Sequence, residues 1–462
     1  MDNFWDSSVW SSLILVAVLL LSLLVANILR RGIPFLRNSL IPTSVLGGAL
    51  LLGVEAIYHA VTGVGLFENE IFNGRGTAEL EIITYHCLAL GFIASALKKS
   101  KGKLTPKRTG EIFNTGVTTV ATYLIQAIFG LCISLVAVKF VKDFFRAAGI
   151  LLPFGYGQGT GQALNYGNIF ETDYGFTGGK SFGLTIAAMG FLCASIGGVI
   201  HLNILKRKGI ITIKSENEKA MHSEQIQSED EIPMQESIDK MTIQISLIAA
   251  AYLLTYGIMY GLGLLLPGMK SVVYGFNFLI GVLAATLIKL ILNGLRKIKV
   301  IRKEFSNEFL LTRASNFFFD IMVVAGIAAI RISILKNYWG ILLIMGIVGM
   351  IITYIYNHIV ARNLFPEYME EQFLTMYGML TGTASTGVIL LREIDGDFKT
   401  PAMENMVYQN FPAIVFGFPM MLLATLAPKK PYLTLAILIA FFAVMNIILF
   451  RSKIFRKKKQ KE

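Results

Sequence analysis

Long uncharged apolar runs recur along the whole chain and alternate with short basic segments. Runs such as residues 11–29, 112–138 and 431–450 reach the roughly 20 residues that an α-helix needs to cross about 30 Å of hydrocarbon. The first run follows an acidic leader and lacks the basic start and cleavage site of a secretory signal, which favours a retained span. The pattern predicts an all-α membrane protein with about eleven crossings, at residues 11–29, 40–60, 80–97, 112–138, 181–205, 241–266, 271–290, 309–330, 338–361, 405–427 and 431–450.

The charge of the connecting loops predicts how the spans are oriented. Basic residues concentrate in short loops, which by the positive-inside rule lie in the cytoplasm. The chain is then a multi-pass protein of the plasma membrane, with its N-terminus outside and its C-terminus cytoplasmic. The densest basic loops are residues 30–37, 98–108, 206–208, 296–303 and 451–461.

Composition narrows the class of protein further. Hydrophobic residues make up 54% of the chain and charged residues 16%, and the mean hydropathy is +0.61, well above that of a soluble domain. The net charge of +12 is spread over loops rather than gathered on a basic face with aromatic residues, which argues against nucleic-acid binding. Cys87, Cys132 and Cys193 lie far apart inside apolar runs, so no disulfide frame or metal knuckle is predicted.

Two further apolar stretches, residues 147–170 and 372–391, do not fit as crossings. A full crossing by either would place the next basic loops on the wrong side of the membrane. The first contains Gly155, Gly157, Gly159 and Gly161, and each interior glycine costs a helix about 1 kcal/mol relative to alanine. We therefore expect two re-entrant hairpins, the first entering from outside and the second from the cytoplasm, covered by protein or lining a wet cavity.

A long polar segment, residues 206–240, divides the chain into two halves with the same order of elements. It reads as a cytoplasmic linker, although a regulatory role is open. The predicted organisation is a first half at residues 1–205, a second half at 241–427, and an extra C-terminal helix with a basic tail at 428–462. Because the first half has an odd number of crossings, the second half is expected to insert upside down.

Short stretches of sequence match between the halves. Ala89-Leu-Gly91-Phe-Ile-Ala94 is similar to Ala325-Gly326-Ile-Ala328, and Gly159-Thr160-Gly161 is similar to Gly382-Thr383-Ala384. Inverted repeats with paired broken helices are typical of secondary transporters. The alternative is that these small residues only allow membrane helices to pack closely.

At these residues the chain resembles the bacterial sodium:glutamate symporter family. The similar motifs are Ile41-Pro42-Thr-Ser-Val-Leu-Gly47-Gly48, Gly157-Gln-Gly159-Thr-Gly161-Gln-Ala163 and Gly378-Met-Leu-Thr-Gly382-Thr-Ala-Ser-Thr-Gly387. The resemblance covers residues from about 11 to 427. It implies sodium-coupled symport of glutamate by alternating access, an inverted-repeat fold whose hairpins meet at the substrate site, and a homodimer.

The sequence departs from the family pattern in both hairpins. The first usually carries Gly-Gly-His-Gly-Thr, whereas Tyr156 and Gln158 stand among the glycines here. The second usually carries Gly-Phe-Gly-Leu-Gly-Ala-Thr, which a more hydroxylated stretch replaces. These differences leave open another small organic anion as substrate and protons as the coupling ion.

An anionic substrate needs backbone amides, carboxamides or guanidinium groups around its carboxylates. Glycines allow close backbone approach, and Gln and Asn side chains bring donors. Arg313 could supply the charge or could anchor its helix at the cytoplasmic interface, and Arg392 is a comparable candidate. The predicted substrate-binding residues are Gly157, Gln158, Gly159, Thr160, Gly161, Gln162, Asn165, Gly382, Thr383 and Arg313.

Sodium is a hard cation, and a broken helix can supply its oxygen ligands from free carbonyls and hydroxyls. The predicted ion-binding residues are Thr381, Ser385, Thr386 and Asp320. The hydroxyls could instead bond back to their own helix. No cofactor is predicted beyond the transported sodium ion.

Asp320 lies near the middle of an otherwise apolar span, where an ionised carboxylate costs several kcal/mol unless it is paired or solvated. It is predicted to bind an ion or carry a proton; the alternative is a structural pair with Gln126 or Asn357. His86 and His358 could carry protons or could simply be hydrogen-bonded within the bundle.

Two other classes of protein fit the sequence less well. An enzyme is disfavoured because the sequence has no His-Glu-x-x-His pair and no Gly-x-Ser-x-Gly elbow. The stretch from Gly175 to Ser181 is one residue short of a phosphate-binding loop. An ion channel also uses re-entrant loops, but channels usually repeat one pore loop around an axis. A channel would not concentrate its solute against a gradient.

Overall fold

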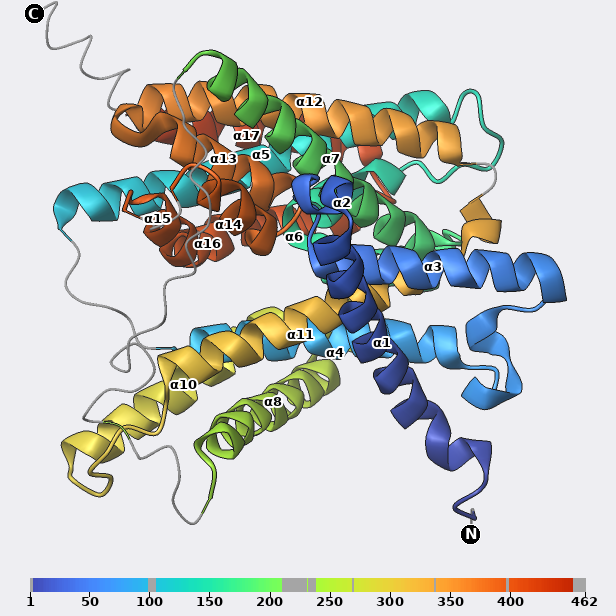
Figure 1. Ribbon diagram of the computed structural model, residues 1–462. Helices are drawn as coiled ribbons and strands as arrows, with labels where there is room; N and C mark the ends of the chain where they lie inside the picture. Colours follow the sequence, from blue (N-terminus) through green and yellow to red (C-terminus); the bar gives the residue numbers. More distant parts are fainter. Residues whose placement is uncertain are drawn as a thin grey trace, which may run out of the picture. The chain divides into compact units, whose positions relative to one another are not determined.

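The computed structural model describes residues 3–98, 105–209, 231, 238–267, 270–335, 338–395 and 399–451, without the side chains of residues 271, 272, 385 and 411. Within these residues the chain is helical, with one isolated β-bridge between Glu231 and Glu304. Figure 1 shows the helices, which follow the apolar runs of the sequence.

Ten helices of the described chain are long and apolar enough to cross a membrane. They are α1 (Ser7–Gly32), α3 (Thr43–Thr62), α4 (Gly76–Ala96), α5 (Pro106–Ala137), α7 (Gly179–Arg207), α8 (Lys240–Leu265), α10 (Asn277–Lys297), α11 (Glu308–Ala328), α12 (Trp339–Leu364) and α17 (Pro431–Leu449).

The remaining helices are shorter or interrupted. They are α2 (Pro34–Asn38), α6 (Leu151–Tyr174), α9 (Lys270–Gly275), α13 (Met369–Thr381), α14 (Ala384–Arg392), α15 (Ala402–Tyr408) and α16 (Asn410–Leu426), with 3-10 turns at Leu66–Glu68, Glu70–Phe72, Ala148–Ile150, Ile332–Leu335 and Pro366–Tyr368. The helices α15 and α16 meet at a bend of 52° and together could form an eleventh crossing. The prediction of an all-α membrane protein is confirmed. The predicted spans overlap these helices, but the span at residues 271–290 covers α9 and only the first part of α10.

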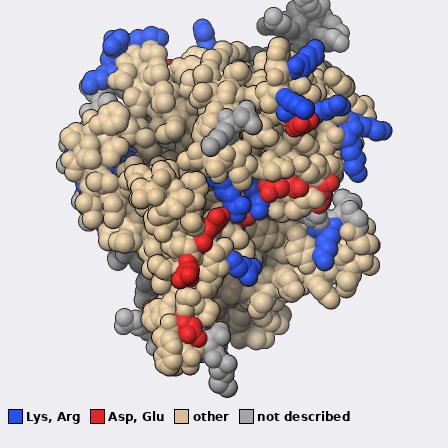
Figure 2. Space-filling view, turned by 90° about the vertical axis from the view of Figure 1, so that its right-hand side faces the viewer, with Lys and Arg blue, Asp and Glu red and all other residues tan. Residues whose placement is uncertain are grey.

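The long helices expose apolar side chains on one face. On α12, Leu343, Ile347, Ile351 and Ile355 are about half exposed at a spacing of four residues. In water such a stripe would favour aggregation, whereas in a bilayer it faces lipid tails. Uncharged residues cover most of the face seen in Figure 2, and the charged side chains gather in a few patches.

The described chain divides into two compact units that do not follow the order of the sequence. Unit 1 comprises Met1–Leu20, Phe67–Lys103 and Ser215–Gly326, and unit 2 comprises the other segments, Leu21–Leu66, Leu104–Lys214 and Ile327–Glu462. Each unit therefore takes helices from both predicted halves. The core of unit 1 packs α4, α8, α10 and α11 around Ile93, Ile248, Ala285 and Leu311.

Most of the predicted linker lies outside the described residues, but its end belongs to a buried polar cluster in unit 1. The ammonium of Lys240 is fully buried and lies 2.8 Å from the carboxylate of Glu231. Asn307 donates to the same carboxylate at 2.6 Å, and Gln244 donates to the backbone oxygen of Phe305 at 2.8 Å. A buried charge is stable only when paired in this way, so Glu231 fixes the end of the linker to the start of α8.

Candidate functional site

The chain reverses direction inside α6, at Gly159. This residue has φ 78° and ψ −170°, a conformation that glycine adopts far more readily than other residues. The rings of Phe154 and Tyr166 stack across the break with centroids 3.8 Å apart. In a straight helix these two residues would be separated by about 18 Å along the axis, so the two arms of α6 form a hairpin.

The glycines around this break have two different roles. The predicted interruption is confirmed only at Gly159, because Gly155 and Gly157 remain helical. Instead, they allow close packing. A Cβ on Gly155 would lie 2.7 Å from the side chain of Ile186 on α7, and one on Gly157 would lie 2.1 Å from the ring of Tyr123 on α5.

A second hairpin is formed by α13 and α14, which reverse at Gly382 and Thr383. Thr383 is extended, with φ −147° and ψ 174°. A Cβ on Gly378 would lie 2.8 Å from the Cα of Gly387, and a Cβ on Gly387 would lie 2.6 Å from the oxygen of Thr375. The two arms therefore touch through backbone atoms, with no room for a side chain between them.

The tips of the two hairpins meet within unit 2. A Cβ on Gly159 would lie 3.1 Å from the methyl group of Thr383. On α7, a Cβ at Gly190 would lie 2.3 Å from the oxygen of Thr381, just before the second break. Two glycine-containing segments more than two hundred residues apart in sequence thus come together. Figure 1 shows α6, α13 and α14 in the same bundle as α5, α7 and α12.

The helices α5 and α12 cross beside these tips through a reciprocal set of polar contacts. Gln126 Nε2 donates to Thr353 Oγ1 at 2.7 Å, and Asn357 Nδ2 donates to Thr122 Oγ1 at 3.4 Å. Gln126 Nε2 also donates to the backbone oxygen of Leu380, at 2.9 Å, two residues before the second break. All four side chains are fully buried.

The sequence analysis did not include this crossing among the candidate site residues. It named Gln126 and Asn357 only as possible partners of Asp320. A signal was present in the spacing. Thr122 and Gln126 stand four residues apart, as do Thr353 and Asn357, which places each pair on one face of its helix.

Several buried polar atoms of the described residues have no hydrogen-bond partner. All but one of those identified lie in unit 2, and most belong to the hairpins or to helices packed on them. They are Gln126 Oε1, Gln162 Nε2, Asn357 Oδ1, His358 Nδ1, Thr386 Oγ1, Asn405 Oδ1 and Gln409 Oε1 in unit 2, and Asn277 Oδ1 in unit 1. Each such atom costs about 1–3 kcal/mol while it stays unpaired, so those near the hairpin tips, Gln126 Oε1, Gln162 Nε2 and Thr386 Oγ1, are candidate contacts for a polar ligand.

The predicted residues of the first hairpin lie at the break of α6 or close to it in sequence. Thr160 is fully buried, and Gln162 and Asn165 are nearly so. Asn165 Nδ2 donates to Gln162 Oε1 at 3.3 Å, which leaves Gln162 Nε2 available. Gly161 is buried next to them, and Gly157 and Gln158 are half-buried. The oxygen of Gly157 accepts a hydrogen bond of 3.1 Å from Tyr123.

In the second hairpin the hydroxyls differ from one another. Thr381 donates to the oxygen of Tyr377 at 2.5 Å, in its own helix. Thr386 is fully buried, and its hydroxyl has no partner. Gly382 is buried and Thr383 half-buried at the turn itself. Ser385, which was also predicted to bind the ion, is one of the residues whose side chains the structure does not describe.

Arg313 and Asp320 belong to the other unit. Both lie on α11 and are exposed within the described chain. The guanidinium of Arg313 lies over the ring of Phe309, 5.1 Å from its centroid, a contact that leaves the charge at the surface. The roles assigned to these two residues stay predictions.

The histidines have hydrogen-bonded positions. His86 Nδ1 lies 2.5 Å from the hydroxyl of Tyr252 in unit 1. In unit 2, His201 is almost fully buried, and its ring joins the Tyr354 hydroxyl at 2.6 Å to the Glu370 carboxylate at 2.8 Å. His358 lies against it, with ring centroids 6.0 Å apart. Sequence reasoning singled out His358 but not its neighbours His201 and Glu370.

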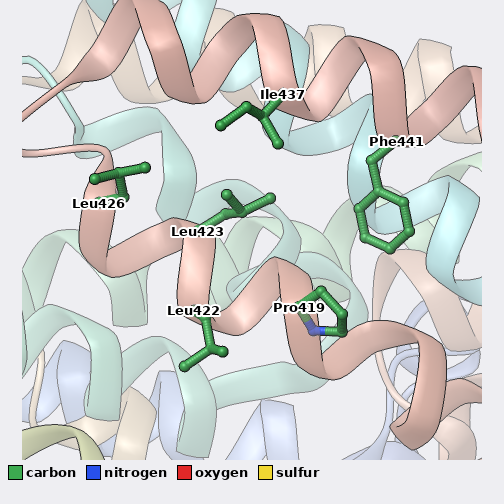
Figure 3. Close-up of a pocket in the computed structure, with 6 residues that line it drawn as sticks. All are labelled: Pro419, Leu422, Leu423, Leu426, Ile437 and Phe441. Atoms are coloured by element: carbon green, nitrogen blue, oxygen red, sulfur yellow. The ribbon is translucent and has the colours of Figure 1, made fainter.

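A separate pocket lies on unit 2 between α16 and α17 (Figure 3). It has a volume of about 460 Å³ and is lined by Pro419, Leu422, Leu423, Leu426, Ile437 and Phe441. Since none of these side chains is polar, the pocket suits hydrocarbon and does not suit a small charged solute.

The long exposed apolar helices define a multi-pass membrane protein. No protein-family model matches the sequence, and the search of curated proteins finds no match either. The resemblance to sodium:glutamate symporters therefore stands on the motifs alone.

Proposed function

We propose that this chain is a secondary active transporter that takes up a small organic anion by sodium-coupled alternating access, with glutamate as the first substrate to test. The observation that carries the proposal is the meeting of two interrupted helices, tip to tip, at Gly159 and Thr383. Paired broken helices of this kind form the substrate and ion sites of many secondary transporters.

The dimensions of the hairpins support the interpretation that they are re-entrant. The helix α13 has 13 residues and α14 has 9, which correspond to about 20 Å and 14 Å. Neither arm can cross about 30 Å of hydrocarbon. The packing of both arms against one another at Gly378 and Gly387 fits a segment that enters and leaves on one side.

The crossing of α5 and α12 supports the proposed inverted repeat. Each helix offers one hydroxyl and, four residues later, one carboxamide, and each carboxamide bonds to the hydroxyl of the other helix. Two antiparallel helices related by a two-fold axis in the membrane plane would make this reciprocal pattern. The helix α5 comes from the first proposed half and α12 from the second.

The division into units supports a moving core. Both hairpins belong to unit 2 together with α5, α7 and α12, whereas α4, α8, α10 and α11 make up unit 1. We propose that unit 2 is the carrier and that unit 1 belongs to the scaffold, which would also form the dimer interface that the family resemblance implies.

Proton coupling is the second candidate, and the partly buried contact between His201 and Glu370 favours it. Two ionisable side chains joined inside the carrier unit could exchange a proton during the transport cycle.

The variant Asp320→Asn tests whether sodium is the coupling ion. Loss of sodium dependence in that variant supports the role predicted for this carboxylate, and unchanged uptake removes Asp320 from the site.

The test is uptake of labelled glutamate into proteoliposomes that hold the purified protein, with and without an inward sodium gradient. Accumulation above equilibrium that needs the gradient and stops with a sodium ionophore is the expected result. Competition with unlabelled dicarboxylates and neutral amino acids then defines the substrate class. Equilibration without accumulation would identify a channel. Absence of any organic-anion uptake under sodium or proton gradients would overturn the proposal.

A further inference from the structure

The crossing of α5 and α12 leaves two buried oxygen atoms without a donor. The amide nitrogen of Gln126 donates to the oxygen of Leu380, and that of Asn357 donates to the oxygen of Thr353 at 2.9 Å. A backbone oxygen can only accept, so these contacts fix which end of each carboxamide is the nitrogen. Gln126 Oε1 and Asn357 Oδ1 are then the atoms left buried and unpaired.

The two carboxamides that carry these oxygens belong to one hydrogen-bonded cluster. The carboxamide of each residue reaches the hydroxyl of a residue four positions from the other, which ties Thr122, Gln126, Thr353 and Asn357 together. All four are at 0% exposure. An unpaired buried carbonyl costs about 1–3 kcal/mol, and two of them in one cluster call for a donor or a cation.

The chemistry of the cluster selects the kind of cation. Its oxygens are carboxamide, hydroxyl and backbone carbonyl groups, which are hard ligands. All of them are neutral, whereas tight divalent sites use several carboxylates. A monovalent cation such as sodium fits this set of oxygens.

The cluster is also connected to the second hairpin. Gln126 holds the oxygen of Leu380, and the chain reverses two residues later at Gly382. A ligand on Gln126 would therefore act directly on the position of the hairpin tip. This gives a physical route by which ion binding could prepare the site between the hairpins.

We propose that a sodium ion binds at the crossing of α5 and α12, with Gln126 Oε1 and Asn357 Oδ1 as ligands. Its role as the coupling ion rests on the proposed transport function. The binding itself does not, because it can be measured without substrate.

The experiment measures binding of ²²Na⁺ and sodium-dependent thermal stabilisation of the full-length protein in detergent, with choline as the replacement ion. Asn357→Leu and Gln126→Met remove the two oxygens at similar volume. We expect each variant to raise the half-saturating sodium concentration by about tenfold or more, because the buried cation loses one of its oxygen ligands. The matched control is Asn363→Leu near the end of the same helix, where the carboxamide is half-buried and donates to the backbone oxygen of Ile359 at 2.7 Å; this variant should bind sodium as the wild type does.

A second variant covers the case in which the first two do not fold. Asn357→Asp keeps an oxygen and adds a negative charge, so it should lower the half-saturating sodium concentration. Potassium and lithium are titrated in parallel to define the selectivity.

Each outcome decides the proposal. Wild-type sodium affinity in folded Asn357→Leu and Gln126→Met, or in Asn357→Asp, would mean that a water molecule fills the crossing, and the proposal would fail. Absence of sodium binding to the wild type would also overturn it. Sodium binding that the variants lose, combined with no sodium-driven uptake by the wild type, would keep this site and reject the proposed coupling.

Discussion

The two hairpins differ in how deeply their arms are buried. In the first, the arms of α6 are buried from Leu151 to Tyr156 and from Gly159 to Gly167, between α5 and α7. In the second, α13 is buried, but α14 begins with an exposed Ala384 and has half-buried Val388 and Ile389. Segments with fewer buried apolar contacts open locally at lower free energy, so we expect α14 to open more easily than either arm of α6.

The backbone conformations at the two breaks also differ. Gly159 alone interrupts α6, in a conformation that depends on glycine, and the stacked rings of Phe154 and Tyr166 close the hairpin. Gly382 and Thr383 interrupt the second hairpin in conformations that do not need a positive φ. A substitution at the first break should therefore cost more than one in the second hairpin.

The largest effect is expected at Gly159. In Gly159→Val the side chain would have to adopt φ 78° and would approach Thr383. Strain of about 1–3 kcal/mol, added to the clash, should lower uptake by more than about tenfold. Gly63→Val is the control, because Gly63 has φ 76° with no atom within 4 Å of its Cβ position. Equal losses in both variants would show that strain alone, and not the meeting of the tips, is responsible.

A smaller effect is expected where the arms of the second hairpin touch. Gly387→Ala places a Cβ against the oxygen of Thr375, and the more exposed α14 can shift to accommodate it. The melting temperature should fall by an amount equivalent to about 1–3 kcal/mol, with uptake reduced but measurable. Gly340→Ala, at the open start of α12, is the comparison. A stable variant with wild-type uptake would contradict the close contact of the arms.

The anchoring of the first hairpin is tested by Tyr156→Phe. The hydroxyl of Tyr156 donates to the oxygen of Gly346 on α12 at 2.6 Å, in a buried position. Removing it leaves that oxygen without this donor and should cost about 1 kcal/mol or somewhat more in thermal stability. Tyr260→Phe on α8, which is largely exposed, should change stability little. A neutral Tyr156→Phe would mean that packing alone holds α6.

The smallest effect is expected at Glu370, on the base of the second hairpin. The hydrogen bond from His201 lowers the pKa of the Glu370 carboxyl from its ordinary value, with burial opposing the shift. A lowered pKa in the folded protein stabilises it above the unfolded pKa, and this stability is lost as the pH falls through the folded value.

Glu370→Gln should therefore flatten the acid limb of the plot of melting temperature against pH. Charged neighbours that also act on this group are Lys208 and His358, and Glu371 lies beside it. Glu367→Gln, at an exposed ion pair with Lys107, serves as the control. An unchanged acid limb in Glu370→Gln would indicate that the contact between His201 and Glu370 does not stabilise the folded protein.

The sequence by itself determined the membrane class and the approximate positions of the long helices, and its glycines marked the two segments in which helices are interrupted. Apolar length and glycine spacing act locally, so they can be read without knowing the partners of a segment. The choice of Gly159 as the break among four glycines was decided by tertiary structure, because Ile186 and Tyr123 occupy the space beside Gly155 and Gly157.

Only the tertiary structure decided which helices form each unit and which polar side chains lie at the hairpin tips. Gln126 bonds to residues 227 and 254 positions later in the chain, and no local pattern encodes such a pairing. The same is true of His201 with Glu370, and of Arg313 and Asp320, which the sequence grouped with the hairpins and which the structure assigns to unit 1. Local patterns fix where a helix forms and breaks, whereas the partner of a buried polar group depends on how distant helices pack.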